Sequence, residues 1–364
     1  MNEAIEKSVR DTSGRAGAGR SVCNTLCATA SLALALGAIG LGATVPGADA
    51  RAQTMDLTMA VIPAPGDAYS SLTSTVPERF ARATGGKVKV TISDSLVPGG
   101  QIVSAVRDGR VDMSAALHTY LAAEEPRFGI FNLPGLIGGM PDYKKVGEGF
   151  WFADTHKIWK ERYKSVVLAE GAWCSQRLFS KTPIQSVEDF RNKRLRVHNP
   201  QTAELMNAMG AKPVPLALPE VMPSLERGVI DGLFTSACYG DGQEYWRVAP
   251  HVQDWGLGPI TGWAVIVNAD VWDKIPGDMK DAIGKEMMAL QREALDNHSK
   301  YDNAALERMK TGGAKLWTAS PEARQQLFAE KFVTPTYDSW YKRAKQVGFD
   351  GNAYIDRIRS TLGR

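Results

Sequence analysis

The sequence predicts an α/β protein folded into two lobes, and three observations lead to this prediction. The chain has 364 residues, which exceeds the usual size of a single domain. Short runs of alternating apolar residues recur between segments that have the 3.6-residue period of a helix, in β-α-β order. Hydrophobic residues make up 44% of the chain and charged residues 23%, so each lobe can bury an apolar core.

The first elements of the predicted fold form two β-α-β units. The first two strands end in loops rich in proline or glycine, and the third continues into a loop through residues 118–120. Gly85 and Gly86 stop the first helix. Strands joined in this way are parallel and their crossovers are right-handed. The predicted elements are strands 57–62, 87–92 and 109–116 and helices 70–84 and 101–108.

A further α/β unit follows between Lys193 and Gly232, and it contains Arg196. This arginine lies near the end of a short alternating strand, ahead of a loop at Asn199 and Pro200. A guanidinium at a strand's end can hold a carboxylate through two parallel hydrogen bonds. Composition alone favours the alternative, an arginine on a solvated loop. The predicted elements are strand 194–197, helix 202–209, extended segment 213–216, helix 220–228 and a strand from 229.

Residues 1–52 have the pattern of a secretory signal peptide. Arg15 and Arg20 precede a small, apolar run over residues 28–45, and small-x-small cleavage sites follow before Gln53. A membrane anchor is the alternative, but alanine and glycine make the run weakly hydrophobic and it barely reaches the ~20 residues of a span. We therefore expect an exported chain with no direct membrane insertion after cleavage.

Two function classes find no support in the sequence. The net charge is +3, and no basic run with interleaved aromatic residues is present, which argues against a nucleic-acid partner. The five histidines have no metal-binding spacing, and neither a phosphate-binding loop nor a GxSxG elbow occurs. Cys174 and His198 are the one conceivable thiol–imidazole pair near Arg196, but no thiol-hydrolase motif surrounds Cys174. We therefore predict that the protein is not an enzyme.

Cys174 and Cys238 are the cysteines that remain once the leader is removed. In an oxidising compartment they either form one disulfide or stay as buried free thiols, and the sequence leaves both alternatives open. Two cysteines so far apart in the chain do not form a metal-binding motif.

The order of motifs around Arg196 resembles the solute receptors of TRAP transporters, the DctP family. The resemblance continues through the first β-α-β units and covers nearly the whole mature chain from about Leu57. The matching motifs are Arg196-Val197, Pro200, Gly210 to Pro215, Glu220-Val221, Gly228 to Gly232, Asp108 to Met113 and Phe128 to Pro134.

This resemblance implies a two-lobed periplasmic binding protein, type II-like, with a long helix that spans the hinge. The proline-free helical tract from Pro276 to Met309 fits that helix. By resemblance Cys174 and Cys238 lie on strands that approach the floor of the cleft. The expected lobes are residues 53–173 with 262–300 (lobe I) and residues 174–261 with 301–364 (lobe II).

In the family, the arginine at the position of Arg196 binds the carboxylate of the ligand. Gln176 occupies the position of a second ligand-binding arginine, and Arg177 beside it points to the opposite face of the strand. Phe234 and Thr235 replace a polar pair, which predicts a more apolar pocket. The other residues that we expect at the ligand are Trp173, Leu218, Leu117, His118, Arg177, Asn199, Tyr239 and Trp263.

The resemblance implies a periplasmic solute-binding protein of a TRAP transporter. The expected ligand is a small organic monocarboxylate with an aromatic or apolar body, a class that includes 2-oxo acids, and the expected partners are the membrane permease subunits that receive it. No cofactor and no metal are expected; some relatives hold a cation near the position of Gln176, but nothing in this sequence demands one. The alternatives are the ligand-binding subunit of a periplasmic sensor and that of an ABC-type importer.

Overall fold

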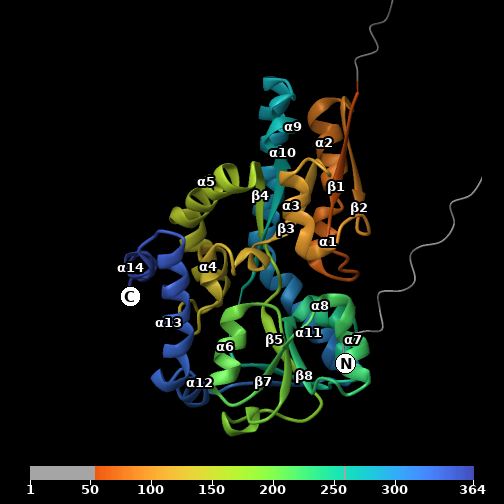
Figure 1. The fold of residues 1–364 in the computed structure, drawn as a ribbon. Coiled ribbons are helices and arrows are strands. Elements are labelled where there is room, and N and C mark those ends of the chain that lie inside the picture. The colour runs from red at the N-terminus through yellow and green to blue at the C-terminus, as the bar shows by residue number, and fades with distance from the viewer. Residues whose placement is uncertain (1–53, 258–259) are drawn as a thin grey trace, which may run out of the picture. The chain divides into compact units, whose positions relative to one another are not determined.

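The computed structural model describes residues 54–257 and 260–364, and Figure 1 shows its elements. The predicted signal peptide lies outside the described residues. The described chain has the predicted α/β fold, built around one sheet of five strands and another of six. None of the described helices is both long and apolar enough to cross a membrane.

The five-stranded sheet contains the first predicted β-α-β units. Its strands are β1 (Met55–Ala60), β2 (Val88–Ser93), β3 (Met113–Leu117), β4 (Ser165–Ala172) and β10 (Gly262–Asn268). Their order is β2-β1-β3-β10-β4. The strand β1 pairs in parallel with β2 and β3, as predicted, whereas β10 is antiparallel to β3 and β4. Because β10 returns from the later part of the chain, it ties the two halves of the sequence together.

The six-stranded sheet contains the unit around Arg196. Its strands are β5 (Gln176–Ser180), β6 (Arg194–Val197), β7 (Lys212–Pro215), β8 (Gly232–Ser236), β9 (His251–Asp254) and β11 (Lys315–Thr318). Their order is β11-β9-β5-β8-β6-β7, with β6 parallel to both β7 and β8. Parallel neighbours place the carboxyl ends of β6, β7 and β8 along the same edge, where open α/β sheets bind their ligands.

Helices cover both sheets (Figure 1). Those that belong to the first half of the chain or to the five-stranded sheet are α1 (Ala68–Thr73), α2 (Val76–Thr84), α3 (Ile102–Arg107), α4 (Met140–Val146), α5 (Phe152–Tyr163), α9 (Ala269–Asp273) and α10 (Gly277–Asp296). The others are α6 (Pro200–Ala208), α7 (Leu218–Glu226), α8 (Ala237–Gly242), α11 (His298–Thr311), α12 (Pro321–Leu327), α13 (Glu330–Gln346) and α14 (Gly351–Leu362). Short helical turns are η1 (Gly99–Gln101), η2 (His118–Leu121), η3 (Pro126–Asn132), η4 (Gly147–Trp151), η5 (Glu188–Phe190) and η6 (Tyr245–Arg247).

The helical tract that the sequence predicts from Pro276 to Met309 is interrupted at one residue. Asn297, with φ −92° and ψ 4°, ends α10 and precedes α11. The helix α10 packs on β4 and α2, whereas α11 packs on α8 of the other sheet. The two helices therefore connect the sheets in series, and the break lies where the chain passes from one sheet to the other.

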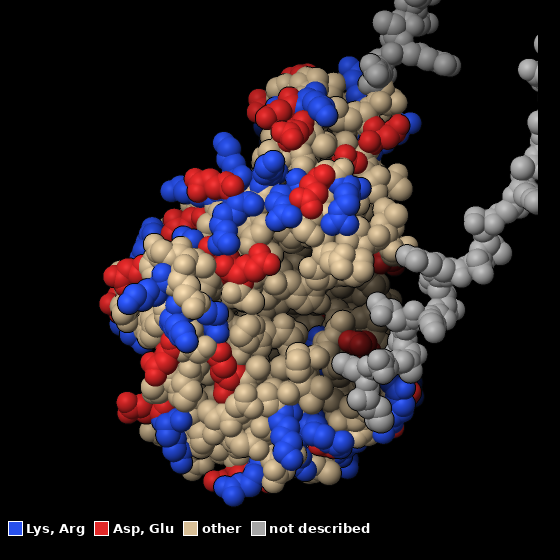
Figure 2. All heavy atoms as spheres, viewed as in Figure 1, with Lys and Arg blue, Asp and Glu red and all other residues tan. Residues whose placement is uncertain are grey.

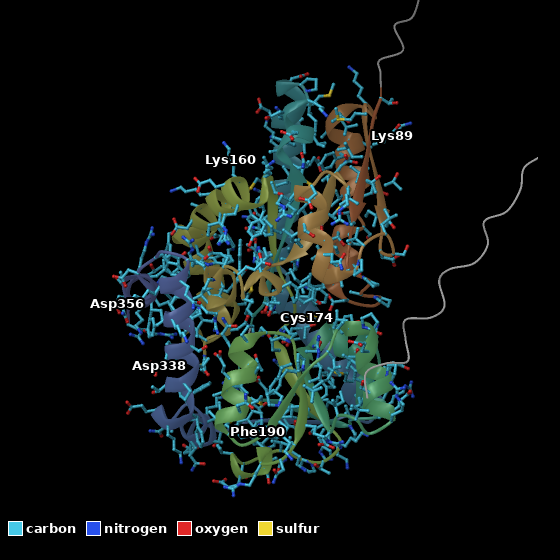
Figure 3. All side chains as sticks on the ribbon, viewed as in Figure 1. Lys89, Lys160, Cys174, Phe190, Asp338 and Asp356 are labelled. Atoms are coloured by element: carbon cyan, nitrogen blue, oxygen red, sulfur yellow. A yellow bond between two sulfur atoms is a disulfide. The ribbon has the colours of Figure 1, made fainter. Side chains whose placement is uncertain are left out.

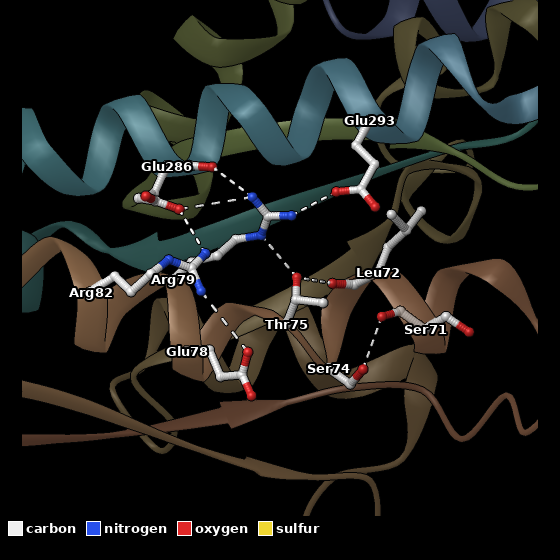
Figure 4. A network of polar contacts seen from close by, with 9 residues as sticks. All are labelled: Ser71, Leu72, Ser74, Thr75, Glu78, Arg79, Arg82, Glu286 and Glu293. Carbon is white, nitrogen blue, oxygen red and sulfur yellow. Dashed lines mark hydrogen bonds and ion pairs between the residues drawn. The ribbon is translucent and has the colours of Figure 1, made fainter.

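An ion-pair network holds α10 against α2 (Figure 4). Arg79 of α2 donates from Nη2 to Glu293 Oε2 at 2.6 Å and from Nε to Thr75 Oγ1 at 2.9 Å. Its neighbour Arg82 reaches Glu286 Oε2 at 2.9 Å. These contacts fix α10 to α2, which packs on β2 of the five-stranded sheet.

Cys174 lies between β4 and β5, where the chain crosses from one sheet to the other (Figure 3). It forms a disulfide with Cys238 of α8, with the two Cα atoms 5.7 Å apart. The helix α11 also holds this crossover, because His298 Nε2 lies 2.9 Å from the carbonyl oxygen of Trp173 and Asp302 Oδ1 accepts from the backbone of Ser175 at 2.9 Å. Of the two alternatives that the sequence leaves open, the structure shows the disulfide.

The last two helices, α13 and α14, pack on helices that belong to both halves of the fold. The helix α13 packs on α6 and on η3, and Trp340 donates from Nε1 to the carbonyl oxygen of Pro126 at 2.9 Å. The helix α14 packs on α4, next to the five-stranded sheet. The C-terminal helices thus contact both halves of the fold.

Candidate ligand-binding site

A cavity of about 970 Å³ opens at the carboxyl ends of the strands. The loops that follow β1 and β2 line it from one sheet, and the loops that follow β6 and β7 line it from the other. Figure 2 shows a hollow whose visible walls are mostly uncharged, whereas lysine, arginine and carboxylate side chains intermingle elsewhere on that face. Seven of the residues that line the cavity are prolines, which lack a backbone N–H, so none of these seven positions offers a backbone hydrogen-bond donor.

A smaller cavity of about 30 Å³, which has room for about one water, lies beside the larger one. The residues that line both cavities are Tyr120, Arg196, His198, Leu218 and Tyr239. These shared residues make the small cavity an inner extension of the large one.

The guanidinium of Arg196 lies at the junction of the two cavities, and the residue is only 2% exposed. Its Nε donates to the carbonyl oxygen of Leu216 at 3.1 Å, and its Nη1 donates to that of Phe234 at 3.0 Å. Leu216 directly follows β7 and Phe234 lies within β8, so the two strands that flank β6 hold the group in one orientation. Within residues 54–257 and 260–364, no acceptor pairs with Nη2.

The charge of Arg196 has no partner of opposite sign in the described part of the chain. Burial lowers the pKa of Arg196, and the surrounding Tyr120, Tyr245 and Tyr239 offset this effect in part. Arginine nevertheless stays protonated in proteins because its pKa is so high. A buried cation without a carboxylate is costly, so an anion that enters this cavity gains a preoriented partner.

His198 lies beside Arg196 and does not add a second charge. Burial, together with the Arg196 guanidinium, lowers the pKa of His198 to about 3. Asn199 Nδ2 lies 3.3 Å from His198 Nε2. The imidazole is therefore neutral at any pH above about 4.

Buried polar atoms of the inner cavity have no hydrogen-bond partner among the described residues. Trp173 Nε1 and Gln176 Oε1 are both in this situation, and their side chains are 4% and 7% exposed. The indole of Trp173 is fixed by stacking on Tyr69, with ring centroids 4.8 Å apart. The unpaired donor of Trp173 and the unpaired acceptor of Gln176 favour a ligand that can form a hydrogen bond with each of them.

The structure brings most of the predicted site residues together. Asn199 lines the large cavity and also caps α6, because its Oδ1 accepts from the backbone N of Thr202 at 2.8 Å. The predicted residues that line the inner cavity are Leu117, Trp173, Gln176, Arg196, Leu218, Thr235 and Tyr239.

Four predicted side chains do not line either cavity. His118 packs on Phe128 and pairs with Glu170 at 3.2 Å, and Trp263 lies in the core against Gly171. The others are Arg177 and Phe234.

Strand geometry explains the last two positions. Arg177 follows Gln176 on β5 and reaches Asp302 Oδ2 at 3.2 Å instead of the cavity. Phe234 alternates with Thr235 on β8, so its ring packs into the core of the six-stranded sheet with Leu178, while its carbonyl oxygen accepts from Arg196.

Sequence reasoning missed several residues of the cavity. Tyr120 and Tyr245 line it near Arg196, and Met222 of α7 lines the apolar wall. A usable signal was the accumulation of prolines after the strands, since loops at the carboxyl ends of parallel strands form such sites. The carbonyl of Leu216, which anchors Arg196, carries no signal in its side chain.

The described residues contain no group of three or more histidine, cysteine, aspartate or glutamate side chains that could hold a metal ion. The polar side chains that line the two cavities are instead mostly amide, indole, hydroxyl, imidazole and guanidinium groups, with Asp94 the one carboxylate among the described lining residues. The guanidinium suits an organic anion.

A family model described as bacterial extracellular solute-binding protein, family 7 (DctP), matches residues 62–344. The chain belongs to the DctP family. This confirms the resemblance to TRAP solute receptors, and it makes the protein a solute receptor of an extracytoplasmic family.

Curated relatives support the assignment over most of the chain. The C4-dicarboxylate-binding periplasmic protein DctP of Rhodobacter capsulatus is 25% identical, over 84% of this chain and 91% of its own. The monocarboxylate 2-oxoacid-binding periplasmic protein all3028 of Nostoc is also 25% identical, over 75% of this chain and 79% of its own. An uncharacterized protein of Salmonella typhimurium, YiiZ, is 29% identical over 48% of this chain, and the match spans 57% of YiiZ.

Solved structures of DctP-family receptors share the fold. DctP6 of Bordetella pertussis, an extracytoplasmic solute receptor binding pyroglutamic acid, has a TM-score of 0.77 and 22% identity. The match covers 84% of this chain and all of that one.

Proposed function

We propose that this protein captures a small organic monocarboxylate in the periplasm and delivers it to the membrane permease subunits of a TRAP transporter. The observation that carries the proposal is the Arg196 guanidinium, which lines the cavity, is buried, is anchored by two carbonyls and has no acceptor for Nη2 among the described residues. A carboxylate that accepts from this group forms charge-assisted hydrogen bonds, which are roughly twice as strong as neutral ones.

The charges around the cavity favour one carboxylate over two. Among the described residues that line it, Arg196 is the one permanent cation, because His198 is neutral. Asp94 lies at the exposed rim and repels a second anionic group. A dicarboxylate would therefore leave one charge without a partner, which costs several kcal/mol, roughly, when the group is buried.

The walls favour an apolar body on the ligand. The prolines lie next to Val97, Leu216, Leu218 and Met222, and these side chains offer dispersion contacts but no hydrogen bonds. A sugar acid would lose the hydrogen bonds of its hydroxyl groups to water against such a wall. An aromatic or branched aliphatic acid, including a 2-oxo acid, suits it better. Relatives of the chain include a receptor named for 2-oxo acids and one named for C4-dicarboxylates.

Ligand capture requires the two lobes to close, and we place the hinge at the break between α10 and α11 and at the crossover near Cys174. Both connections are short: α10 and α11 pack on different sheets, and the crossover at Cys174 joins β4 of one sheet to β5 of the other. A ligand that contacts both lobes shifts the equilibrium toward the closed state. The described chain includes Ile62 and Tyr120 on one wall and Arg196 on the other, so such contacts are available.

Titration calorimetry with the purified mature protein tests the proposal. Phenylpyruvate is expected to bind more tightly than succinate or glucuronate, and the Arg196→Ala variant is expected to lose phenylpyruvate binding by at least about 100-fold. Tight binding of glucuronate would contradict the apolar pocket, and unchanged affinity in Arg196→Ala would contradict the carboxylate site. Mass spectrometry of the molecule that co-purifies with the protein would identify the natural ligand.

A further inference from the structure

Asp67 is a fully buried carboxylate at the contact between the two halves of the fold. It precedes α1, and its Oδ1 accepts from the backbone N of Tyr69 at 2.7 Å, as an N-cap residue does. Its Oδ2 accepts from Ser236 Oγ at 3.4 Å. Since Ser236 ends β8 in the six-stranded sheet and also lines the inner cavity, this hydrogen bond joins the two lobes at the ligand site.

Close backbone packing seals Asp67 from water. A Cβ atom placed on Gly66 would lie 2.9 Å from the Cα of Gly242, and Gly66 has a φ of +78° that favours glycine. The loop that carries Asp67 is therefore pressed against α8. The helices α1 and α8 lie on opposite sides of this contact (Figure 1), and Ala68 and Cys238 both line the outer groove beside it.

Nothing of opposite charge compensates Asp67 in the described part of the chain. The phenols of Tyr69 and Tyr239 interact with it and are neutral. Asp241 in the outer groove has its own cation, Arg308, at 2.7 Å. The remaining titratable or charged groups of the surrounding elements are Tyr120, Arg196 and His198 in the inner cavity and Glu244 and Tyr301 in the outer groove.

We propose that the Asp67–Ser236 contact makes lobe closure, and with it ligand affinity, depend on pH, because Asp67 takes up a proton when the lobes close. The inference rests on the proposed function, since it requires a receptor that closes on its ligand. When the lobes separate, Ser236 and α8 withdraw and water reaches the carboxyl group. The closed state then binds the proton more tightly than the open state, so protons favour closure.

The direction of the effect follows from the two states of the carboxyl group. Burial raises the pKa of Asp67 from 3.8 to about 7 in the arrangement seen here, despite the hydrogen bonds from Tyr69 and Ser236, which lower it. In the open, solvated state the pKa returns toward its ordinary value. Closure is therefore favoured below about pH 7 and loses this contribution as the pH rises through 7, so Kd should be about tenfold lower at pH 6 than at pH 8.5.

Calorimetry with phenylpyruvate across this pH range tests the inference, because the carboxyl group of the probe stays ionised throughout. The wild type should show the tenfold change. Asp67→Asn keeps the shape and the acceptor but cannot ionise, so its affinity should be high and independent of pH; Asp67→Ser, which can still cap α1, serves if that variant folds poorly. Asp241→Asn is the matched control, a neighbouring carboxylate outside the contact, and should keep the wild-type pH dependence.

A ligand-free measurement separates this inference from the proposed function. Spin labels at Lys89→Cys and Lys212→Cys, exposed positions on the two sheets, report the distance between the lobes. Short distances should be more populated at pH 6 than at pH 8.5 in the otherwise wild-type chain and equally populated in the chain with Asp67→Asn. Failure of phenylpyruvate to bind at every pH counts against the proposed function, whereas lobe distances and affinities that do not change with pH in the wild type overturn the inference.

Discussion

Two arginines of the six-stranded sheet have similar burial but different surroundings. Arg177 on β5 and Arg196 on β6 are 9% and 2% exposed, and β8 separates their strands. Arg177 donates to Asp302 at 3.2 Å and has Asp254 at 3.6 Å. Arg196 has two backbone carbonyls and no carboxylate within the described residues.

The comparison shows how burial alone fails to identify a ligand site. A buried arginine with its own carboxylates is already neutralised, and it serves to hold α11 against the crossover between the sheets. A buried arginine held only by carbonyl dipoles keeps an uncompensated charge and an open donor. The missing partner, and not the arginine itself, is the feature that points to a bound anion.

Substitution of the two arginines by alanine should separate the two roles most strongly. Arg196→Ala is expected to weaken phenylpyruvate binding by about 100- to 1,000-fold, because the ligand carboxylate would be buried without its cation. Arg177→Ala should change Kd by less than about threefold, since the side chain does not reach the cavity. Equal losses of phenylpyruvate affinity in the two variants, measured by calorimetry, would show that the two arginines do not have different roles in binding.

For the free energy of unfolding we expect the larger effect at Arg177 and not at Arg196. Arg177→Ala should lower the free energy of unfolding by about 3 kcal/mol, because Asp302 stays buried without its partner. The double variant Arg177→Ala, Asp302→Asn should recover part of that loss, whereas a simple cavity effect would not be recovered. Denaturant titrations of the single and double variants measure the difference.

Removal of the disulfide should lower stability more clearly than ligand affinity, since the bond holds the crossover between Trp173 and Gln176. Cys174→Ser with Cys238→Ser is expected to lower the free energy of unfolding by at least about 2 kcal/mol, because the bond closes a loop with a sequence separation of 64. Affinity should fall less than in Arg196→Ala. A stability equal to that of the wild type in the same denaturant titration would contradict this expectation.

Substitution of His198 should have the smallest effect, on the pH dependence of stability. It tests whether Arg196 is the only positive charge among the described residues that line the cavity. Because the pKa of His198 is lowered to about 3, the native state stays neutral while the unfolded chain protonates below about pH 6.5. Stability should therefore fall with decreasing pH, by about 1 kcal/mol between pH 6.5 and 5.5 from this residue. His198→Gln should remove that part of the pH dependence; an unchanged slope would mean that His198 is charged in the native protein.

Periodicity predicted the sheets well but not where the helical tract breaks. The alternating strands 57–62 and 194–197 correspond to β1 and β6, and the parallel pairing of β1 follows from its short crossovers. The break at Asn297 is not predicted, although Asp296 to Ser299 are four weak helix formers, because none of them is the proline or glycine that marks a helix end most clearly. The helices on its two sides pack on different sheets. The helix α14 is also absent from the predicted elements, although Asp350 caps it and Ile355 and Ile358 recur at helical spacing.

The site shows the same limit. Arg196, Gln176 and Trp173 could be placed from the family motifs, and they line the cavity. Phe234 could not be assigned to the correct side of β8, because one residue of register decides between cavity and core. His118 lies in the helical turn η2, where the alternation of a strand gives no guide. The anchoring of Arg196 by the carbonyl of Leu216 depends on backbone geometry that no side chain encodes.

A crystal structure of the protein with its co-purified acid is the most direct test of the central claim. We expect a ligand carboxylate oxygen within about 3 Å of Arg196 Nη2, with the carbonyl contacts of Leu216 and Phe234 still in place. A carboxylate bound elsewhere, with the Arg196 guanidinium contacting only carbonyls or water, would contradict it.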